Sequence, residues 1–358
     1  MSESTTRRTF LQQAAGAATV AGLADRVLSS TAEASTGIPT RELGRTGERV
    51  SILCLGGWHT AAAEDEAASI RLVHAAIDEG VTFMDNAWEY HEGRAEEVMG
   101  KALGQDGYRQ KAFLMTKNCA REYEGSKKNL EESLKRLQTD VIDLFYLHRY
   151  DKVTPLEDSI GLLADLVREG KVREIGLSEV SAETLRKAHA IHPIAAVQTE
   201  YSLWTREPEI AVLDACRDVG ATFVSFSPVA RGFLTGALRD VDSLVEKDFR
   251  RGMPRFFPEN FARNLLLLDD FGELARHQGC TMGQLALAWL LHVDDNVIPI
   301  PGTTSPAHLE ENFAAMDIPL DDDTVAEAGR IINRHTVTGD RYVEATQAEI
   351  DTEQFEKA

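Results

Sequence analysis

The chain has 358 residues, of which 43% are hydrophobic and 27% charged, and its 58 acidic and 38 basic side chains give a formal net charge of −20. No cluster of Lys and Arg is large enough to grip a phosphate backbone, so nucleic acid is not expected as a partner. No apolar run reaches the length of a helix that spans a membrane, so no stable membrane span is expected. The length suits one large α/β barrel.

The N-terminal segment has the features of an export signal. Arg7 and Arg8 precede a mildly apolar, Ala- and Gly-rich stretch at 14–24, and small residues end at Ala34. This pattern predicts a twin-arginine (Tat) signal over residues 1–34. The Tat export machinery would then be a partner, and the protein would be periplasmic or extracellular, or cytoplasmic if the signal is not used. An amphipathic helix is the alternative, but the Gly residues would weaken it.

Eight short apolar runs alternate with segments of helical period, a pattern typical of repeated βα units around a parallel sheet. We therefore predict a single-domain (β/α)8 TIM barrel over residues 40–335, followed by a polar C-terminal tail at 336–358. The segment 41–49, which contains Gly44 and Gly47, is expected to form a hairpin that closes the barrel floor. The expected strands are 50–55, 82–86, 112–116, 141–147, 173–177, 196–200, 222–227 and 297–300.

Glycines mark the ends of several helices between these strands. Gly80, Gly170 and Gly220 follow helical patterns at 70–79, 156–169 and 210–219, each in the place of a left-handed cap. Additional material separates the seventh and eighth strands. It consists of a loop at 229–264 and helices expected at 265–278 and 281–291. A final helix is expected at 321–334.

Four polar residues follow the ends of expected strands, where barrel enzymes place their active sites. Asp85 and Tyr90 follow the second strand, Lys117 ends the third and His148 ends the fourth. Carbonyl reduction needs a proton at the oxygen, and free tyrosine, with a pKa of about 10, is a poor donor. A nearby Lys117 ammonium is expected to lower the Tyr90 pKa, Asp85 to hold that lysine, and His148 to orient the carbonyl.

These residues lie in motifs that resemble those of the aldo-keto reductase family, over residues 40–320. The resemblance implies an NAD(P)-dependent oxidoreductase that reduces a small aldehyde or ketone reversibly, without a metal. It implies Tyr90 as the general acid in a tetrad with Asp85, Lys117 and His148. The motifs are Val81-Thr82-Phe83-Met84-Asp85-Asn86-Ala87-Trp88-Glu89-Tyr90, Met115-Thr116-Lys117 and Tyr146-Leu147-His148.

The same resemblance implies a set of cofactor-binding residues. Ser178 and Gln198 would hold the carboxamide, Phe226 would pack on the nicotinamide ring, and the backbone of 229–234 would follow the pyrophosphate. Glu179 departs from the asparagine frequent in relatives, and a carboxylate cannot donate to the carboxamide oxygen. The remaining residues in this set are Ser227, Pro228, Arg231, Gly232 and Leu234.

A small-residue turn and a helix start after the eighth strand can receive an anion. Relatives often carry Lys or Arg near Ser305 or His308 to bind a 2′-phosphate, and both charges are missing here. NADP(H) is therefore expected only from the family resemblance, and NAD(H) stays open. The chain contains no dinucleotide-fold glycine fingerprint and no Walker loop. The residues expected at this end are Gly302, Thr303, Thr304, Ser305, His308, Glu311 and Asn312.

Trp58 and Trp88 are candidates to line an apolar substrate pocket, and Phe256 and Phe257 could serve in the lid or the core. Four cysteines (54, 119, 216 and 280) form no CxxC pair, so their spacing signals no metal centre, and disulfides stay open. A barrel isomerase or aldolase would use a similar Lys but leaves Tyr90 without a role, and a metal hydrolase lacks converging ligands. A redox-sensing, nicotinamide-binding protein with little turnover is the non-enzymatic alternative.

Overall fold

The computed structural model describes residues 37–63, 65–120 and 122–356, so the predicted signal at 1–34 lies outside the described residues. The chain divides into two units, 1–36 and 37–358, and the fold below is that of the second unit. Among the described residues, no helix is long and apolar enough to cross a membrane.

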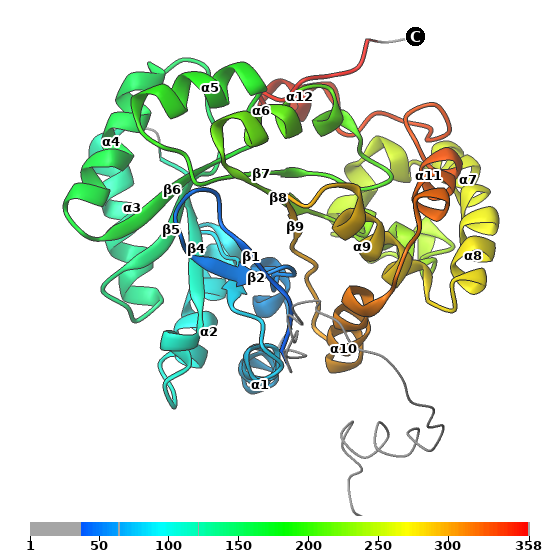
Figure 1. The fold of residues 1–358 in the computed structure, drawn as a ribbon, viewed down its shortest axis with the longest axis horizontal. Helices are drawn as coiled ribbons and strands as arrows, with labels where there is room; N and C mark the ends of the chain where they lie inside the picture. The colour runs from blue at the N-terminus through cyan, green and yellow to red at the C-terminus, as the bar shows by residue number, and fades with distance from the viewer. Residues whose placement is uncertain (1–36, 64, 121, 357–358) are drawn as a thin grey trace, which may run out of the picture. The chain divides into compact units, whose positions relative to one another are not determined.

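The centre of the unit is a curled parallel sheet (Figure 1). Within the described ranges it has seven strands, and their order in the sheet follows their order in the chain. Each crossover between neighbouring parallel strands runs through a helix, as the alternating pattern predicts. The strands are β3 (Phe83–Met84), β4 (Phe113–Asn118), β5 (Ile142–Leu147), β6 (Val172–Ser178), β7 (Ala196–Glu200), β8 (Thr222–Phe226) and β9 (Val297–Pro299).

The expected first strand at 50–55 is only partly correct. Residues Arg49–Ser51 form β2, which pairs antiparallel with β1 (Thr40–Glu42) in the predicted hairpin. Further along, the Cys54 N–H donates to Pro299 O at 3.0 Å, while the Asp85 N–H donates to Leu55 O at 3.0 Å. This segment therefore touches both edges of the sheet. The return hydrogen bond of a parallel pair with β9 would come from residue 301, which is a proline and has no N–H.

Helices cover the outer face of the sheet (Figure 1). Gly80, Gly170 and Gly220 have φ values of 105°, 73° and 72°, which confirms the three left-handed caps. Asp65 begins the first helix by accepting the Ala67 N–H. The helices that precede β8 in the chain are α1 (Glu66–Asp78), α2 (Arg94–Leu103), α3 (Tyr123–Arg136), α4 (Leu156–Arg168), α5 (Ala182–Ile191) and α6 (Val212–Val219).

Additional helices lie between β8 and β9, as expected, and others follow β9. The pattern at 265–278 underestimated this helical region, because Pro258 starts another helix, as proline does at a first helical position. Thr281 and Gln284 form a reciprocal cap at the start of the helix that begins at Met282. The helices are α7 (Pro258–Leu265), α8 (Leu267–His277), α9 (Met282–Val293), α10 (Pro306–Ala314), α11 (Asp322–Ile331) and α12 (Glu344–Ala348).

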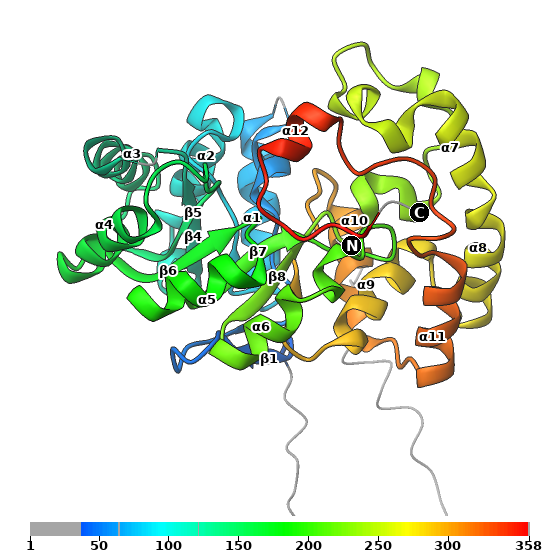
Figure 2. The same cartoon turned by 90° about the horizontal axis from the view of Figure 1, so that it is seen from above.

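The polar composition of the C-terminal segment concealed its packing. The side chains of Arg341 and Ile350 are buried. The Lys152 ammonium donates to the carbonyl oxygens of Ala348 and Ile350, both at 2.9 Å. Figure 2 shows this segment (red) passing from α11 to α12 and then turning back. After α12, Asp351 accepts the backbone N–H of Ser181, the residue that precedes α5. Much of the predicted tail is therefore part of the folded unit.

Candidate active site

Lys117 joins Asp85 and Tyr90 at the ends of β3 and β4. Its side chain is 0% exposed, and Nζ lies 2.5 Å from Asp85 Oδ1, 2.7 Å from Asn86 O and 3.1 Å from the Tyr90 hydroxyl. An ammonium has three N–H donors, and these three acceptors use all of them. A buried cation paired in this way has a fixed position, so the lysine holds the tyrosine hydroxyl at a defined place.

Asp85 is itself held from the opposite side. The Gly57 N–H donates to its Oδ2 at 3.1 Å, and the Gln198 amide donates to its Oδ1 at 3.2 Å. Residue 57 must be glycine for this approach, because a Cβ there would lie 2.0 Å from the Asp85 carbonyl oxygen. The loop after the hairpin therefore completes the support of the Asp85–Lys117 pair.

The pKa values of Tyr90 and Lys117 agree only in part with the expectation. Burial raises the pKa of Tyr90 to about 12, and the Lys117 charge offsets only part of this rise. The expected net fall of the Tyr90 pKa is therefore wrong, although the lysine acts in the expected direction. Burial also lowers the pKa of Lys117, but Asp85 and Tyr90 outweigh it and leave the lysine pKa above its usual value. At neutral pH the site holds an ammonium and a neutral phenol.

His148 follows β5, and its ring lies edge-on to the Tyr90 ring with centroids 6.0 Å apart. Its Nδ1 lies 3.0 Å from Glu89 Oε1 and 3.6 Å from Cys119 Sγ. Burial lowers the pKa of His148 despite the opposing effect of Glu89. The hydrogen bond from His148 lowers the pKa of Glu89 to about 2. The imidazole is thus neutral at neutral pH, and Nε2 is the nitrogen left to face a substrate.

Sequence reasoning missed Glu89 and Cys119 as neighbours of His148. Glu89 adjoins Tyr90 in the chain, and Cys119 lies two residues after Lys117, but nothing in either spacing points to His148. The contact arises because β3, β4 and β5 are adjacent and parallel, so the residues that follow them meet at one edge. Their sheet order was the only available signal.

The two tryptophans lie in different places. Trp58 is 42% exposed, and its ring contacts Tyr90 edge-on with centroids 5.1 Å apart, which suits the wall of a substrate pocket. Trp88 instead points to α3, where its indole N–H donates to Glu132 and Arg136 lies over its ring. The structure does not bring Trp88 to the pocket. Phe256 is buried and packs on Trp204 and Phe261, so it belongs to the core.

The residues expected to bind nicotinamide form a continuous wall. Ser178 of β6 and Gln198 of β7 are register neighbours, and both are buried. Phe226 ends β8, and Ser227 after it has a φ of 50°. Pro228 and Val229 then lead to Ala230, Arg231 and Gly232, which also have positive φ, and to buried Leu234. Within this turn the N–H groups of Ala230, Gly232 and Leu234 donate to the carbonyl oxygens of Ser227 and Val229, which fixes its shape.

Two charged residues expected beside the cofactor form ion pairs with other side chains of the chain. Glu179, with a φ of 56°, accepts Arg341 at 2.9 Å, and Arg149 lies 3.5 Å from its other oxygen. Arg231 pairs with Glu200. The Glu179 carboxylate is therefore occupied by arginines, which explains how a residue that cannot donate to a carboxamide is accommodated there.

At the end of β9, a turn leads into α10. Thr303 Oγ1 accepts the Ser305 N–H at 3.0 Å, and Ser305 caps α10 by accepting the His308 N–H at 3.5 Å. Thr304 and His308 are exposed, while Gly302, Ser305 and Asn312 are half-exposed. Glu311 accepts the Thr281 hydroxyl at 2.6 Å and so ties α10 to α9. The helix start remains accessible to an anion.

Comparison with known proteins decides the family. The model of the aldo/keto reductase family matches residues 52–333. The chain belongs to the aldo/keto reductase family. It is 42% identical over 321 residues to the aldo-keto reductase yakc [NADP(+)] of Schizosaccharomyces pombe. The matched region covers 85% of this chain and 94% of that protein. As an aldo-keto reductase, the protein is an oxidoreductase.

Two solved structures extend the comparison. The glycerol dehydrogenase of Gluconobacter oxydans has a TM-score of 0.77 at 27% identity, covering 84% of this chain and 97% of that one. A thermostable aldo-keto reductase in complex with the inhibitor epalrestat has a TM-score of 0.68 at 29% identity, covering 82% of this chain and 100% of the other. The present chain matches the fold of both structures over more than four fifths of its own length.

Proposed function

We propose that this aldo-keto reductase reduces aldehydes or ketones to alcohols, reversibly, with NADP(H) as the cofactor. The observation that carries the proposal is the buried Lys117 ammonium, which contacts Asp85 and the Tyr90 hydroxyl together. Lys117 and Asp85 are buried and paired with each other, whereas the side chain of Tyr90 is only partly covered, so its hydroxyl is the group we expect to reach a carbonyl. An aldolase or isomerase has no use for it.

In this mechanism Tyr90 is the general acid. The carbonyl oxygen takes the phenolic proton as hydride reaches the carbonyl carbon, so the tyrosine O–H bond breaks and the alcohol O–H bond forms. Lys117 stabilises the phenolate, which matters because burial alone opposes its formation. Asp85 keeps the ammonium in place, and neutral His148 orients the carbonyl. The nicotinamide, when bound, supplies the hydride.

The cofactor residues take the following proposed roles. Ser178 and Gln198 hold the carboxamide, Phe226 packs on the ring, and the positive-φ turn after Ser227 follows the pyrophosphate. The turn and the start of α10 take the phosphate end, with Thr304, Ser305 and His308 as the hydrogen-bonding groups. The name of the Schizosaccharomyces pombe relative carries NADP(+), which supports NADP(H) here. The missing Lys or Arg at this end keeps NAD(H) in the test.

We also propose that residues 50–55 close a (β/α)8 barrel as its eighth strand, supported by the hydrogen bonds of Cys54 and Leu55 to both sheet edges. Slow amide exchange at Leu55 and Gly56 supports closure, and exchange as fast as in an exposed loop contradicts it.

The twin-arginine export of the chain is a further proposal. Replacement of Arg7 and Arg8 by Lys is expected to retain the full chain in the cytoplasm, and unchanged export would reject it.

The test of function is oxidation of NADPH and NADH with a panel of aldehydes and ketones, with Tyr90→Phe beside the wild type. Turnover by the wild type alone, with cofactor bound by both proteins, supports the proposed mechanism and fixes the coenzyme preference. Cofactor binding with stoichiometric, very slow oxidation in both proteins would favour the redox-sensing alternative. Equal turnover in both would remove Tyr90 as the acid.

A further inference from the structure

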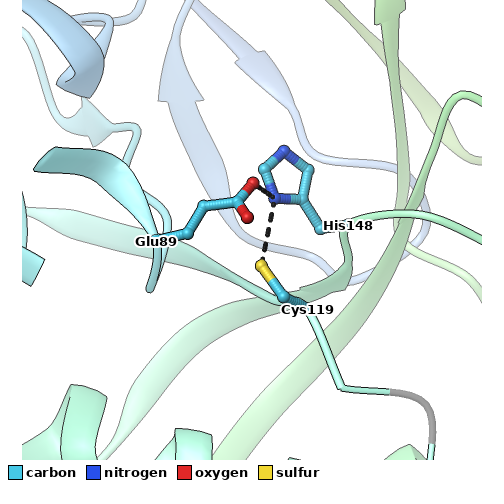
Figure 3. Close-up of side chains that lie close together, drawn as sticks. All are labelled: Glu89, Cys119 and His148. Atoms are coloured by element: carbon cyan, nitrogen blue, oxygen red, sulfur yellow. Dashed lines mark hydrogen bonds and ion pairs between the residues drawn. The ribbon is translucent and has the colours of Figure 1, made fainter. Parts of the chain in front are cut away.

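Glu89, Cys119 and His148 direct one donor atom each toward a common point (Figure 3). The three residues follow β3, β4 and β5, three adjacent strands of the sheet. The donor atoms all lie within 4.8 Å of one another. His148 Nδ1 is the shared neighbour, 3.0 Å from a Glu89 oxygen and 3.6 Å from Cys119 Sγ.

We propose that Glu89, Cys119 and His148 form a binding site for a zinc ion. A thiolate, an imidazole and a carboxylate together form a donor set that Zn²⁺ prefers over harder cations. Zinc bonds of about 2.0–2.3 Å in a tetrahedron place neighbouring ligand atoms roughly 3.4–3.6 Å apart. The 3.6 Å between His148 Nδ1 and Cys119 Sγ matches that spacing. The 3.0 Å between His148 Nδ1 and the Glu89 oxygen is shorter, so the Glu89 side chain must rotate away from the imidazole to receive the ion.

The surroundings give the ion a route in and hold its ligands. The Glu89 side chain is 51% exposed, while that of His148 is 12% exposed, so the site opens to solvent on the glutamate side. The backbone N–H of His148 donates to the backbone oxygen of Asn118 at 2.9 Å, which holds the main chain at His148 beside the residue that precedes Cys119. On binding, Cys119 releases its thiol proton to solvent and the sulfur binds zinc. The His148 proton that faces Glu89 passes through solvent from Nδ1 to Nε2, so that Nδ1 binds the ion, and water takes the fourth position.

Zinc bound at this site would take no part in the chemical step but would hinder access to it. The site shares His148 with the proposed active site, and Tyr90 adjoins Glu89 in the chain, so a bound ion crowds the approach of a carbonyl to Tyr90. We therefore expect zinc to inhibit reversibly, a step that rests on the proposed function. The spacing of the cysteines in the sequence could not signal this site, because its ligands come from three separate strand ends.

Zinc binding is measured first, on the full chain without substrate, by calorimetric titration with zinc chloride. One ion per chain is expected. Cys119→Ala and Glu89→Gln should each weaken binding by at least about tenfold, the lower limit seen when even an outer-shell partner of a metal site is removed. Cys280→Ser and Glu92→Gln are matched controls, because Cys280 lies in a different region and Glu92 is exposed. Unchanged affinity in Cys119→Ala would overturn the proposal.

X-ray absorption of the zinc-loaded wild type gives a second readout. One sulfur at about 2.3 Å with nitrogen and oxygen at about 2.0–2.1 Å supports the site, and a spectrum without sulfur overturns it. Inhibition is then measured as NADPH oxidation against zinc concentration, each variant relative to its own zinc-free rate. Zinc that binds without slowing the wild type overturns the inhibition. Zinc binding to a protein without carbonyl turnover leaves the site standing and rejects the proposed function instead.

Discussion

Arg341 forms ion pairs with both Glu179 and Glu200, at 2.9 and 2.8 Å, and so bridges the ends of two neighbouring strands. The arginine lies 162 residues from the first partner and 141 from the second. Its guanidinium is also 5.7 Å from the centre of the Phe226 ring, where the nicotinamide is proposed to pack. The C-terminal segment is therefore tied to the cofactor side of the site by a buried charge.

Arg341→Ala should destabilise the fold by about 3–5 kcal/mol, because it leaves two buried carboxylates short of a cation. Urea denaturation measures the free energy of unfolding. Arg330→Ala is the matched control, since that arginine pairs with Glu327 on the surface of α11 and should cost less than about 1 kcal/mol. Equal losses in the two variants would mean that the buried bridge contributes no more than a surface pair.

The same cluster should make stability depend on acid. Burial would raise the pKa of Glu200, but Arg231, Arg341 and Arg255 outweigh it and lower that pKa to about 2. The folded pKa is thus below the usual 4.5, so this contribution is present above pH 4.5 and is lost as the pH falls toward 2. Its size is on the order of 3 kcal/mol. Glu200→Gln should flatten the fall of unfolding free energy in this window, and an identical slope would contradict the assignment.

Tyr90→Phe should lower kcat by about 10²–10⁴-fold with cofactor affinity unchanged, because the phenylalanine keeps the ring but has no proton to give. Stopped-flow measurement of the hydride step separates this loss from product release. Tyr108→Phe is the control, since that hydroxyl contacts Asp78 on the surface between α1 and the loop before β4. A comparable loss in the control would point to a general effect of tyrosine removal.

Gly57→Ala should impair activity more than stability alone explains. Its Cβ would lie 2.0 Å from the Asp85 carbonyl oxygen, so the loop must move and the hydrogen bond to the Asp85 carboxylate is lost. Gly161→Ala in α4 has open space around its Cβ and should stabilise the protein by roughly 0.5–1 kcal/mol. Thermal unfolding and NADPH oxidation of both variants provide the comparison. Normal kinetics in Gly57→Ala would show that the loop adapts without cost.

The alternation of strands and helices was predictable because each element carries its own hydrophobic period and glycine caps. Asp85, Lys117 and Tyr90 were predictable for a related reason, since each follows an apolar run and such runs end at one face of the sheet. The expected first strand is only partly regular, because hydrogen bonding at residues 54–56 depends on Pro299 and Pro301, more than 240 residues away. Arg341 and Cys119 were missed because their roles exist only through contacts between distant segments.

The bridge made by Arg341 also has a consequence for the order of folding. Arg149 and Arg231 lie close in the chain to Glu179 and Glu200, but Arg341, the arginine that joins the two carboxylates, is synthesised long after them. Contacts of such large sequence separation form late, since loop closure must precede them. A nascent chain therefore carries Glu179 and Glu200 without Arg341 until residue 341 has been added. Docking of the C-terminal segment is therefore expected to follow the formation of the two strands that Arg341 bridges.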